Sequence, residues 1–239
     1  MPSIPAVVIA TTSILALTGC VASTVPAEEA GRRATTRSTP DEPRATVGAR
    51  PTEPSPPRTA EPAWRTSDGS PRQALMSIPA IDVRALPVVP YRGSPDDRPG
   101  TRIQNGGVAA SPHGPRGGVG PGGVGNYLVT AHRTSSTRAF EDLPRLRVGD
   151  RVHVVAGGTR YVYRVTATRS TSFRSTKSLA RQSAAVPGHP GRTPTRAMIT
   201  LSTCATPEDH ARGNYWADEF GNPAHRIDKI GVLVATRPA

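Results

Sequence analysis

The chain has 239 residues, a formal net charge of +12 and only 4% aromatic residues. A charge of this size can indicate a nucleic-acid-binding protein, but the arginines are dispersed and lack interleaved aromatic residues or a basic helical face. We therefore predict no nucleic-acid partner and favour an anionic cell envelope instead. The 26 prolines and 23 glycines indicate long portions without regular structure, so we predict one folded domain in the C-terminal two thirds.

Residues 1–20 are predicted to be a lipoprotein-type signal segment. An apolar run from Ile4 to Leu17 leads into Leu-Thr-Gly-Cys, and small residues before a cysteine are typical of a lipobox, in which Cys20 is lipidated and becomes the mature N-terminus. The run is too short for a comfortable membrane span. Because no Lys or Arg precedes it, a simple cleaved signal and an uncleaved membrane anchor stay open as alternatives.

Residues 21–72 are predicted to be a disordered linker. They are rich in Pro, Thr, Ser, Ala and Arg and show no sustained apolar period, so they cannot bury enough surface to offset the entropy of ordering. At roughly 3 Å per residue in the proline-rich parts, such a tether reaches on the order of 100 Å from a membrane.

Residues 73–239 are predicted to form an all-β domain, because short β-prone runs alternate there with Gly and Pro. The runs lie at residues 74–78, 83–89, 127–131, 151–155, 160–167 and 198–203. The pair Gly157-Gly158 predicts a hairpin, since paired glycines accept the positive φ of a tight primed turn. We expect only short helices, at residues 139–146 and 177–182.

Cys204, at the end of the last of these runs, is the most informative residue. Successive residues of a strand point to opposite faces, so Cys204 shares the more polar face with Thr200 and Ser202. A thiol presented there can be a nucleophile. A free cysteine is also often a small buried hydrophobe, and a disulfide to Cys20 is the alternative for an exported chain. Lipidation of Cys20 would remove the disulfide and leave Cys204 as the only thiol.

The run Thr-Leu-Ser-Thr-Cys at residues 200–204 resembles the cysteine motif of the sortase family, the cysteine transpeptidases that attach proteins to Gram-positive cell walls. Residues 125–133 resemble the histidine strand of that family, and residues 226–233 are similar to its arginine strand. Residues 99–104 and 110–115 further resemble class E sortases of high-GC actinobacteria. The resemblance covers roughly residues 73 to 235 and implies a closed sortase-type β-barrel of about eight strands, with short helices in the connections.

The resemblance also implies three chemical roles. Cys204 would attack the scissile carbonyl as a thiolate, and His132 would protonate the leaving amine and then deprotonate the incoming one. Arg226, which is always charged and has several fixed donors, would stabilise the oxyanion or hold the substrate backbone. We expect no cofactor and no metal, because the chain has neither a His-Glu-x-x-His motif nor paired cysteines.

Several residues compete for these roles. His210 and His225 are alternative bases, and both lie in a connection that is longer than we expect between the cysteine and arginine strands of a sortase. The alternative for Arg226 is a purely structural ion pair with Asp228 on the same strand face. In that case Arg133, next to the candidate histidine, would take the catalytic role of the arginine.

The function implied by the resemblance is cysteine transpeptidation at the cell surface. The enzyme would cleave a Leu-Pro-x-Thr-Gly-like signal, Leu-Ala-x-Thr-Gly in class E, between Thr and Gly through a thioester on Cys204, and transfer the protein to a wall-precursor amine. The implied partners are surface proteins with such signals, the peptidoglycan precursor and, through the N-terminal anchor, the membrane at its extracytoplasmic face. The alternatives are a related peptidase with water as acceptor and a non-catalytic lipoprotein that binds wall peptide.

Overall fold

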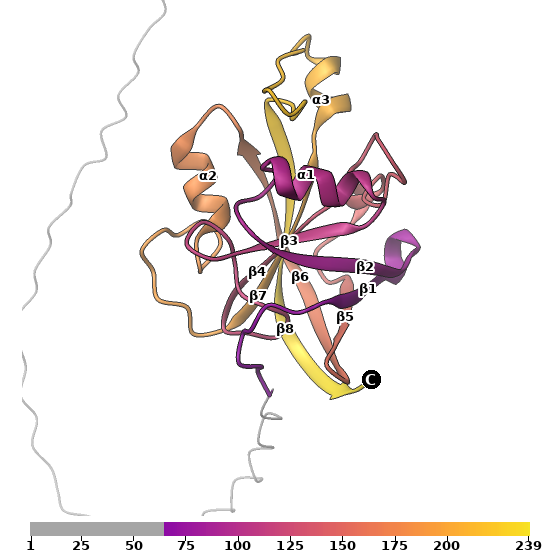
Figure 1. Cartoon of the computed structure of the whole chain (residues 1–239), viewed down its shortest axis with the longest axis vertical. Coiled ribbons are helices and arrows are strands. Elements are labelled where there is room, and N and C mark those ends of the chain that lie inside the picture. Colours follow the sequence, from indigo (N-terminus) through magenta and orange to yellow (C-terminus); the bar gives the residue numbers. More distant parts are fainter. Residues whose placement is uncertain (1–64) are drawn as a thin grey trace, which may run out of the picture. The chain divides into compact units, whose positions relative to one another are not determined.

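A closed β-barrel organises residues 65–239, the part of the chain that this computed structural model describes (Figure 1). Around the barrel the strands follow the order β1-β2-β3-β4-β7-β8-β6-β5. The strands are β1 (Ala74–Ile78), β2 (Val83–Arg92), β3 (Ala109–His113), β4 (Gly125–Thr130), β5 (Arg151–Ala156), β6 (Thr159–Ser172), β7 (Ala197–Cys204) and β8 (His225–Pro238). The predicted eight-stranded all-β barrel is therefore confirmed.

The predicted signal segment at residues 1–20, including Cys20, lies outside the described residues, as does the linker up to residue 64. Residues 67–70, which the composition places in the linker, bond to the folded domain. The backbone N–H of Ser67 donates to the carbonyl of Gly122 at 2.9 Å, and that of Gly120 donates to the carbonyl of Gly69 at 2.7 Å.

Two strand pairs in the barrel are parallel, and the remaining pairs are antiparallel. The parallel pairs are β2 with β3 and β4 with β7. Parallel strands need a crossover connection, and the one from β4 to β7 contains β5, β6 and a helix. This crossover brings the carboxyl ends of β4 and β7 to the same end of the barrel.

The hairpin predicted at Gly157-Gly158 joins β5 to β6. Ala156 pairs with Thr159 across it, and the two glycines have φ values of 56° and 73°. Positive φ at both central residues is the requirement of a type I′ turn, which explains why two glycines occupy it.

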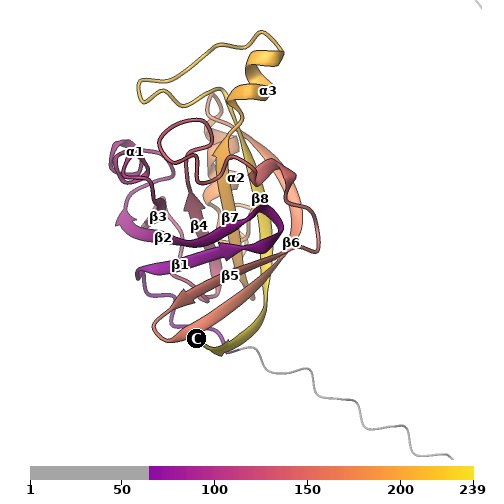
Figure 2. The ribbon, with the colours of Figure 1, turned by 90° about the vertical axis from the view of Figure 1, so that its right-hand side faces the viewer.

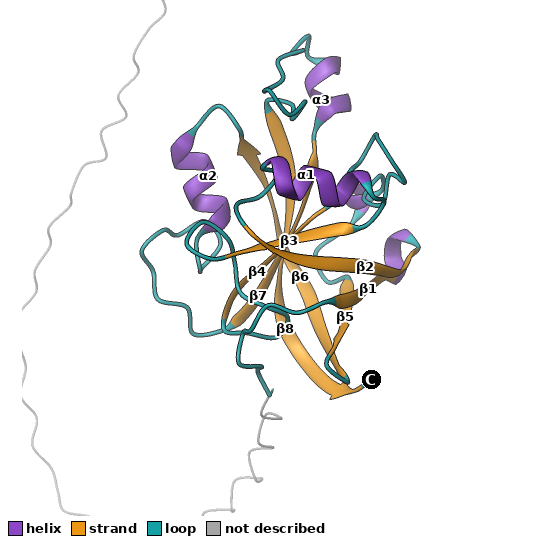
Figure 3. Ribbon diagram, in the orientation of Figure 1, coloured by secondary structure: helices purple, strands orange, loops and turns teal. Residues whose placement is uncertain are grey.

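Helices occur only in the connections between strands (Figure 3). They are α1 (Arg98–Asn105), α2 (Thr176–Ser183) and α3 (Thr206–Ala211), with 3-10 turns η1 (Pro79–Ile81) and η2 (Leu143–Arg145). Helix α2 confirms the prediction at residues 177–182. The prediction at residues 139–146 is wrong beyond η2: Pro144 lacks a donor N–H, and the segment instead buries Phe140, Leu143 and Leu146 in the core. No helix in residues 65–239 is long and apolar enough to cross a membrane.

Strands β4 and β7 are buried on both faces, which determines where polar residues can gather. Tyr127 and Ile199 point into the main hydrophobic core, whereas Asn126 and Thr200 are buried on the opposite face, where the Thr200 hydroxyl donates to Asn126 Oδ1 at 2.8 Å. Asn126 in turn donates to the carbonyls of Gln182 and Ala184 at the end of α2. The C-terminal end of helix α2 therefore lies against the polar outer face of these two strands.

Candidate active site

The site lies where β7 ends and β8 begins, at the end of the barrel from which α3 and the loop after it project (Figures 1 and 2). Cys204 is the last residue of β7, and it stands directly opposite Arg226, the second residue of β8, in the antiparallel register. Residues directly opposite each other carry their side chains on the same face. Cys204 and Arg226 are therefore neighbours.

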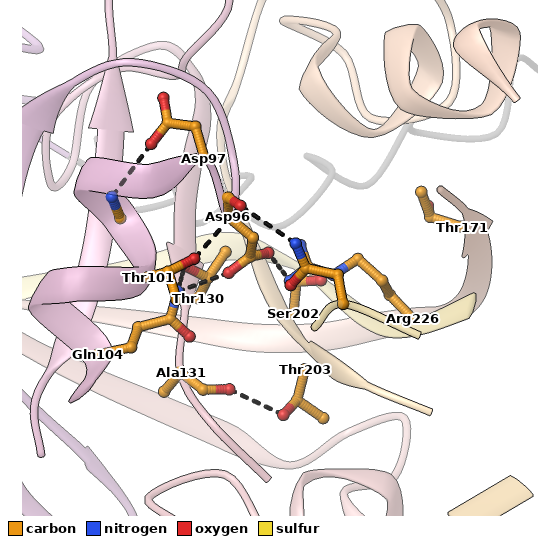
Figure 4. Close-up of polar contacts among 12 residues, drawn as sticks. Asp96, Asp97, Thr101, Gln104, Thr130, Ala131, Thr171, Ser202, Thr203 and Arg226 are labelled. Carbon is orange, nitrogen blue, oxygen red and sulfur yellow. Dashed lines mark hydrogen bonds and ion pairs between the residues drawn. The ribbon is translucent and has the colours of Figure 1, made fainter. Parts of the chain in front are cut away.

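His132 lies on the other side of Cys204, just beyond the end of β4. The last registered pair of the parallel strands is Thr130 with Ser202, so His132 and Cys204 are each two residues further along. Beyond that pair the backbone of Ala131 still donates to Ser202 O at 3.3 Å, and the Thr203 hydroxyl donates to Ala131 O at 2.8 Å (Figure 4). The structure thus brings the three predicted site residues to one end of three adjacent strands.

The His132 side chain is oriented by Asn105, the last residue of α1. Its Nε2 lies 2.8 Å from Asn105 Oδ1, and because an amide oxygen only accepts, Nε2 carries the proton and Nδ1 is left as an acceptor. Partial burial lowers the pKa of His132 below its usual value near 6.5, so the ring is uncharged at neutral pH. Asn105 was not among the residues that the sequence singled out.

The Cys204 thiol is protonated at neutral pH. Burial, as the main cause, raises its pKa to about 12; the negative charge of Asp218 adds to the shift, and the positive charge of Arg133 opposes it. The uncharged thiol and the uncharged imidazole are therefore the resting forms of the two groups.

Arg226 is buried, with 1% of its surface exposed, and forms an ion pair with Asp96 from the connection between β2 and α1 (Figure 4). Its guanidinium also lies over the ring of Phe173, 4.7 Å from the centroid. Burial lowers the pKa of Arg226 to about 10, so the side chain stays charged at neutral pH. Its Nε and Nη1 are buried and have no hydrogen-bond partner among residues 65–239, so both nitrogens carry unsatisfied donors.

Asp96 is itself fixed by a side chain of α1. Gln104 Nε2 donates to Asp96 Oδ1 at 2.5 Å and to the Thr130 hydroxyl at 3.1 Å, so it links the ion pair to the end of β4 (Figure 4). The Asn222 side chain donates to the backbone carbonyl of Asp96 at 3.2 Å. The ion-pair partner of Arg226 is thus Asp96, and the alternative pairing with Asp228 is not the one that forms.

Asp228 instead accepts three hydrogen bonds beneath α2. Ser202 donates to it at 2.5 Å, Gln182 at 2.8 Å and Thr171 at 2.5 Å. Ser202 and Asp228 lie two residues inward from Cys204 and Arg226, on the same face. This buried network connects α2 to the two strands that carry the candidate nucleophile and the arginine.

The competing histidines occupy other places. His210 is exposed and stacks on Tyr215, with 4.7 Å between ring centroids. His225 precedes Arg226 in β8 and so points to the opposite face, where its Nδ1 lies 2.7 Å from Asp209 Oδ1.

A groove of about 500 Å³ runs beside the Arg226–Asp96 pair. It lies between α2, the connection from β2 to α1, and the loop before β8. Its lining includes Pro95, Asp96, Phe173, Leu179, Gln182 and Phe220. Residues 65–239 contain no cluster of three or more His, Cys, Asp or Glu side chains able to hold a metal ion.

Comparison with known proteins agrees with this geometry. The family model of the sortase domain matches residues 76–217, a stretch that contains His132 and Cys204 and ends before Arg226. A comparison with curated protein sequences gave no match.

Solved sortases share the fold. The sortase SrtA from Actinomyces oris superimposes with a TM-score of 0.53 at 19% identity over 76% of this chain and 90% of its own. Sortase E1 from Streptomyces coelicolor, solved with a tripeptide in its active site, superimposes with a TM-score of 0.52 at 22% identity, over 73% of this chain and 94% of its own. Sortase E from Streptomyces avermitilis superimposes with a TM-score of 0.50 at 24% identity, over 72% of this chain and 93% of its own.

The family model spans more than half of the chain, and the barrel carries a cysteine at the end of β7, with a histidine just after β4 and an arginine in β8 on either side of it. The chain therefore belongs to the sortase family. It is a cysteine transpeptidase.

Proposed function

We propose that this sortase cleaves a Leu-Ala-x-Thr-Gly-type signal between Thr and Gly and transfers the protein to a cell-wall precursor amine. The observation that carries the proposal is the position of Cys204 at the end of β7, with His132 level with it on one side and Arg226 opposite it on the other. This arrangement supplies a nucleophile, an acid-base group and an oxyanion donor together. The preference for Ala in the signal rests on the resemblance of residues 99–104 and 110–115 to class E sortases.

Each proton in this reaction has an acceptor. The Cys204 thiol gives its proton to Nδ1 of His132, and the thiolate attacks the carbonyl carbon of Thr in the signal. Nε and Nη1 of Arg226, which have no partner among the described residues, donate to the oxyanion that forms. When the C–N bond breaks, the imidazolium protonates the leaving Gly amine, and a thioester remains. The incoming amine then loses its proton to His132 as it attacks the thioester and releases the Cys204 thiolate, and the thiolate takes that proton back from His132.

The groove beside Arg226 has the chemistry to hold the signal. Phe173, Leu179 and Phe220 provide apolar walls for small aliphatic side chains. Its lining includes Asp96 and Gln182, which contact Arg226 and Ser202 respectively, so a peptide bound there lies beside the Arg226–Asp96 pair. We propose that the residues before the scissile bond occupy this groove.

The test is an incubation of the enzyme with a Leu-Ala-x-Thr-Gly peptide and diglycine, read by mass spectrometry, with a Leu-Pro-x-Thr-Gly peptide run in parallel. We expect a product in which diglycine is joined to Thr, and faster turnover of the Ala peptide. Cleavage without diglycine transfer would assign the chain to the peptidases that use water as acceptor. Binding without cleavage would favour the non-catalytic wall-binding protein.

We also propose that the enzyme works at the extracytoplasmic face of the membrane. The support is the pattern Leu-Thr-Gly-Cys that ends at Cys20, followed by a polar, proline-rich segment. A diacylglyceryl group on Cys20 would hold the domain at the membrane, and the following segment would give it reach toward wall precursors and surface proteins.

A further inference from the structure

Arg133, the residue after His132, reaches from the end of β4 to two partners across the site. Its side chain is 13% exposed, and both ends of its guanidinium bind Glu208 of α3, with Nη2 donating to Oε1 at 2.9 Å and Nη1 donating to Oε2. Nη1 also donates to the backbone carbonyl of Cys204 at 3.4 Å. One side chain therefore joins the segment of the candidate base to the residue that carries the thiol.

This contact acts where the strand ladder has already ended. Thr130 and Ser202 form the last registered pair of β4 and β7, so no further ladder pair holds His132 beside Cys204. A planar guanidinium bound at both nitrogens has few remaining orientations, and Glu208 therefore fixes the Arg133 side chain that contacts Cys204. The pair restrains the two segments at the level of the reacting groups.

The charge of Arg133 also acts on the thiol. Burial and Asp218 raise the pKa of Cys204, and Arg133 is the group that lowers it. Arg226 also faces Cys204 from β8, and its guanidinium is paired with Asp96. The titratable or charged side chains on the elements around Cys204 include Arg133 and His132 after β4, Glu208, Asp209 and His210 in α3, Asp218 in the loop before β8, and His225, Arg226 and Asp228 in β8.

We propose that Arg133, held by Glu208, is a positioning residue of this enzyme: it fixes the backbone of Cys204 beside His132 and supplies the positive charge that favours the thiolate. A guanidinium close to a thiolate stabilises it electrostatically, and a bidentate carboxylate keeps that guanidinium in place. The proposal rests on the proposed function, because it takes Cys204 as the nucleophile.

Two readouts on the full chain separate charge from position. The rate of Cys204 alkylation by iodoacetamide between pH 7 and 9, followed by mass spectrometry on the Cys204 peptide, reports the thiolate population. Turnover of the sorting peptide reports the complete site. For Arg133→Gln we expect the pKa of the thiol to rise and alkylation to slow by at least about threefold at every pH. Below the pKa, the thiolate population changes about tenfold for each unit of the thiol pKa, so a threefold change corresponds to about half a unit. We expect turnover to fall by at least about tenfold.

Two further variants keep the positive charge of Arg133 but disturb its position, so turnover should fall while alkylation does not. Arg133→Lys keeps the charge and loses the planar fork, so alkylation should stay within about twofold of wild type while turnover stays low. Glu208→Gln keeps Arg133 and removes its carboxylate, so alkylation should not slow, while turnover falls. Arg138→Gln is the matched control, because Arg138 forms an exposed ion pair with Glu141 a few residues away; both readouts should remain at wild-type values.

A folded Arg133→Gln protein with a wild-type alkylation profile would overturn the proposal. Equal slowing of alkylation in Arg133→Lys and Glu208→Gln would also overturn it, because it would indicate a merely structural role. If Arg133→Gln does not fold, these two variants decide the question. If the wild-type enzyme turns over no sorting peptide but the alkylation pattern is as expected, the proposed function fails and the effect of Arg133 on the thiol stands.

Discussion

The buried ion pair between Arg226 and Asp96 makes a quantitative prediction for Asp96→Asn. The substitution keeps the shape of the side chain but leaves the Arg226 guanidinium, 1% exposed, without its carboxylate (Figure 4). Breaking a buried pair by neutralising one partner costs about 3 to 5 kcal/mol of unfolding free energy, and the lower end applies here because the amide keeps an acceptor oxygen. For a domain of this size, about 3 kcal/mol lowers the melting temperature by roughly 6 to 12 °C.

Thermal unfolding followed by circular dichroism measures this loss. The matched control is Asp82→Asn, because Asp82 pairs with Arg84 at the surface, where both side chains are at least 80% exposed, and because Asn tolerates the left-handed conformation of residue 82. The control should shift the melting temperature by roughly 2 °C or less. Equal, small shifts for the two variants would contradict the account of Arg226 as a desolvated charge held by Asp96.

Three further predictions address the chemistry and the anchor. His132→Ala should lower turnover by roughly 10²- to 10⁴-fold and His210→Ala should leave it unchanged, as measured by peptide cleavage; the reverse order would make the connection before β8 part of the site. Because burial raises the pKa of Cys204 to about 12, alkylation by iodoacetamide should increase about tenfold per pH unit from pH 7 to 10, and a plateau below pH 9 would contradict the raised pKa. Cys20→Ser should abolish labelling by an alkyne fatty acid in an actinobacterial host, and label that persists in this variant would refute lipidation.

Local patterns were sufficient to predict an all-β domain, whereas the closed barrel was implied by the resemblance to the sortase family. Alternating runs and the Gly157-Gly158 turn indicated β-strands and a hairpin, because both signals depend only on residues that are close in the sequence. The helix expected at residues 139–146 failed because its apolar residues pack into the core instead, around Pro144. Tertiary packing there overrides the helical pattern.

The partners of the site residues could not be predicted in the same way. Asp96 lies 130 positions before Arg226, and Asn105 precedes His132 by 27, so neither contact leaves a signal in the local sequence. Both partners come from the connection between β2 and β3. This connection lies beside β4 because β2 pairs in parallel with β3 and β3 pairs briefly with β4. Only the closed topology brings them to the end of β7.

The most direct test of the account is the intact mass of the enzyme during turnover. Rapid acid quenching of a reaction with a Leu-Ala-x-Thr-Gly peptide should trap a species heavier than the enzyme by the acyl fragment that ends in Thr, with the added mass on the peptide that contains Cys204. The adduct should disappear on addition of diglycine and should not form in Cys204→Ala. An adduct at another residue, or cleavage by a folded Cys204→Ala protein, would contradict the assignment of Cys204 as the nucleophile.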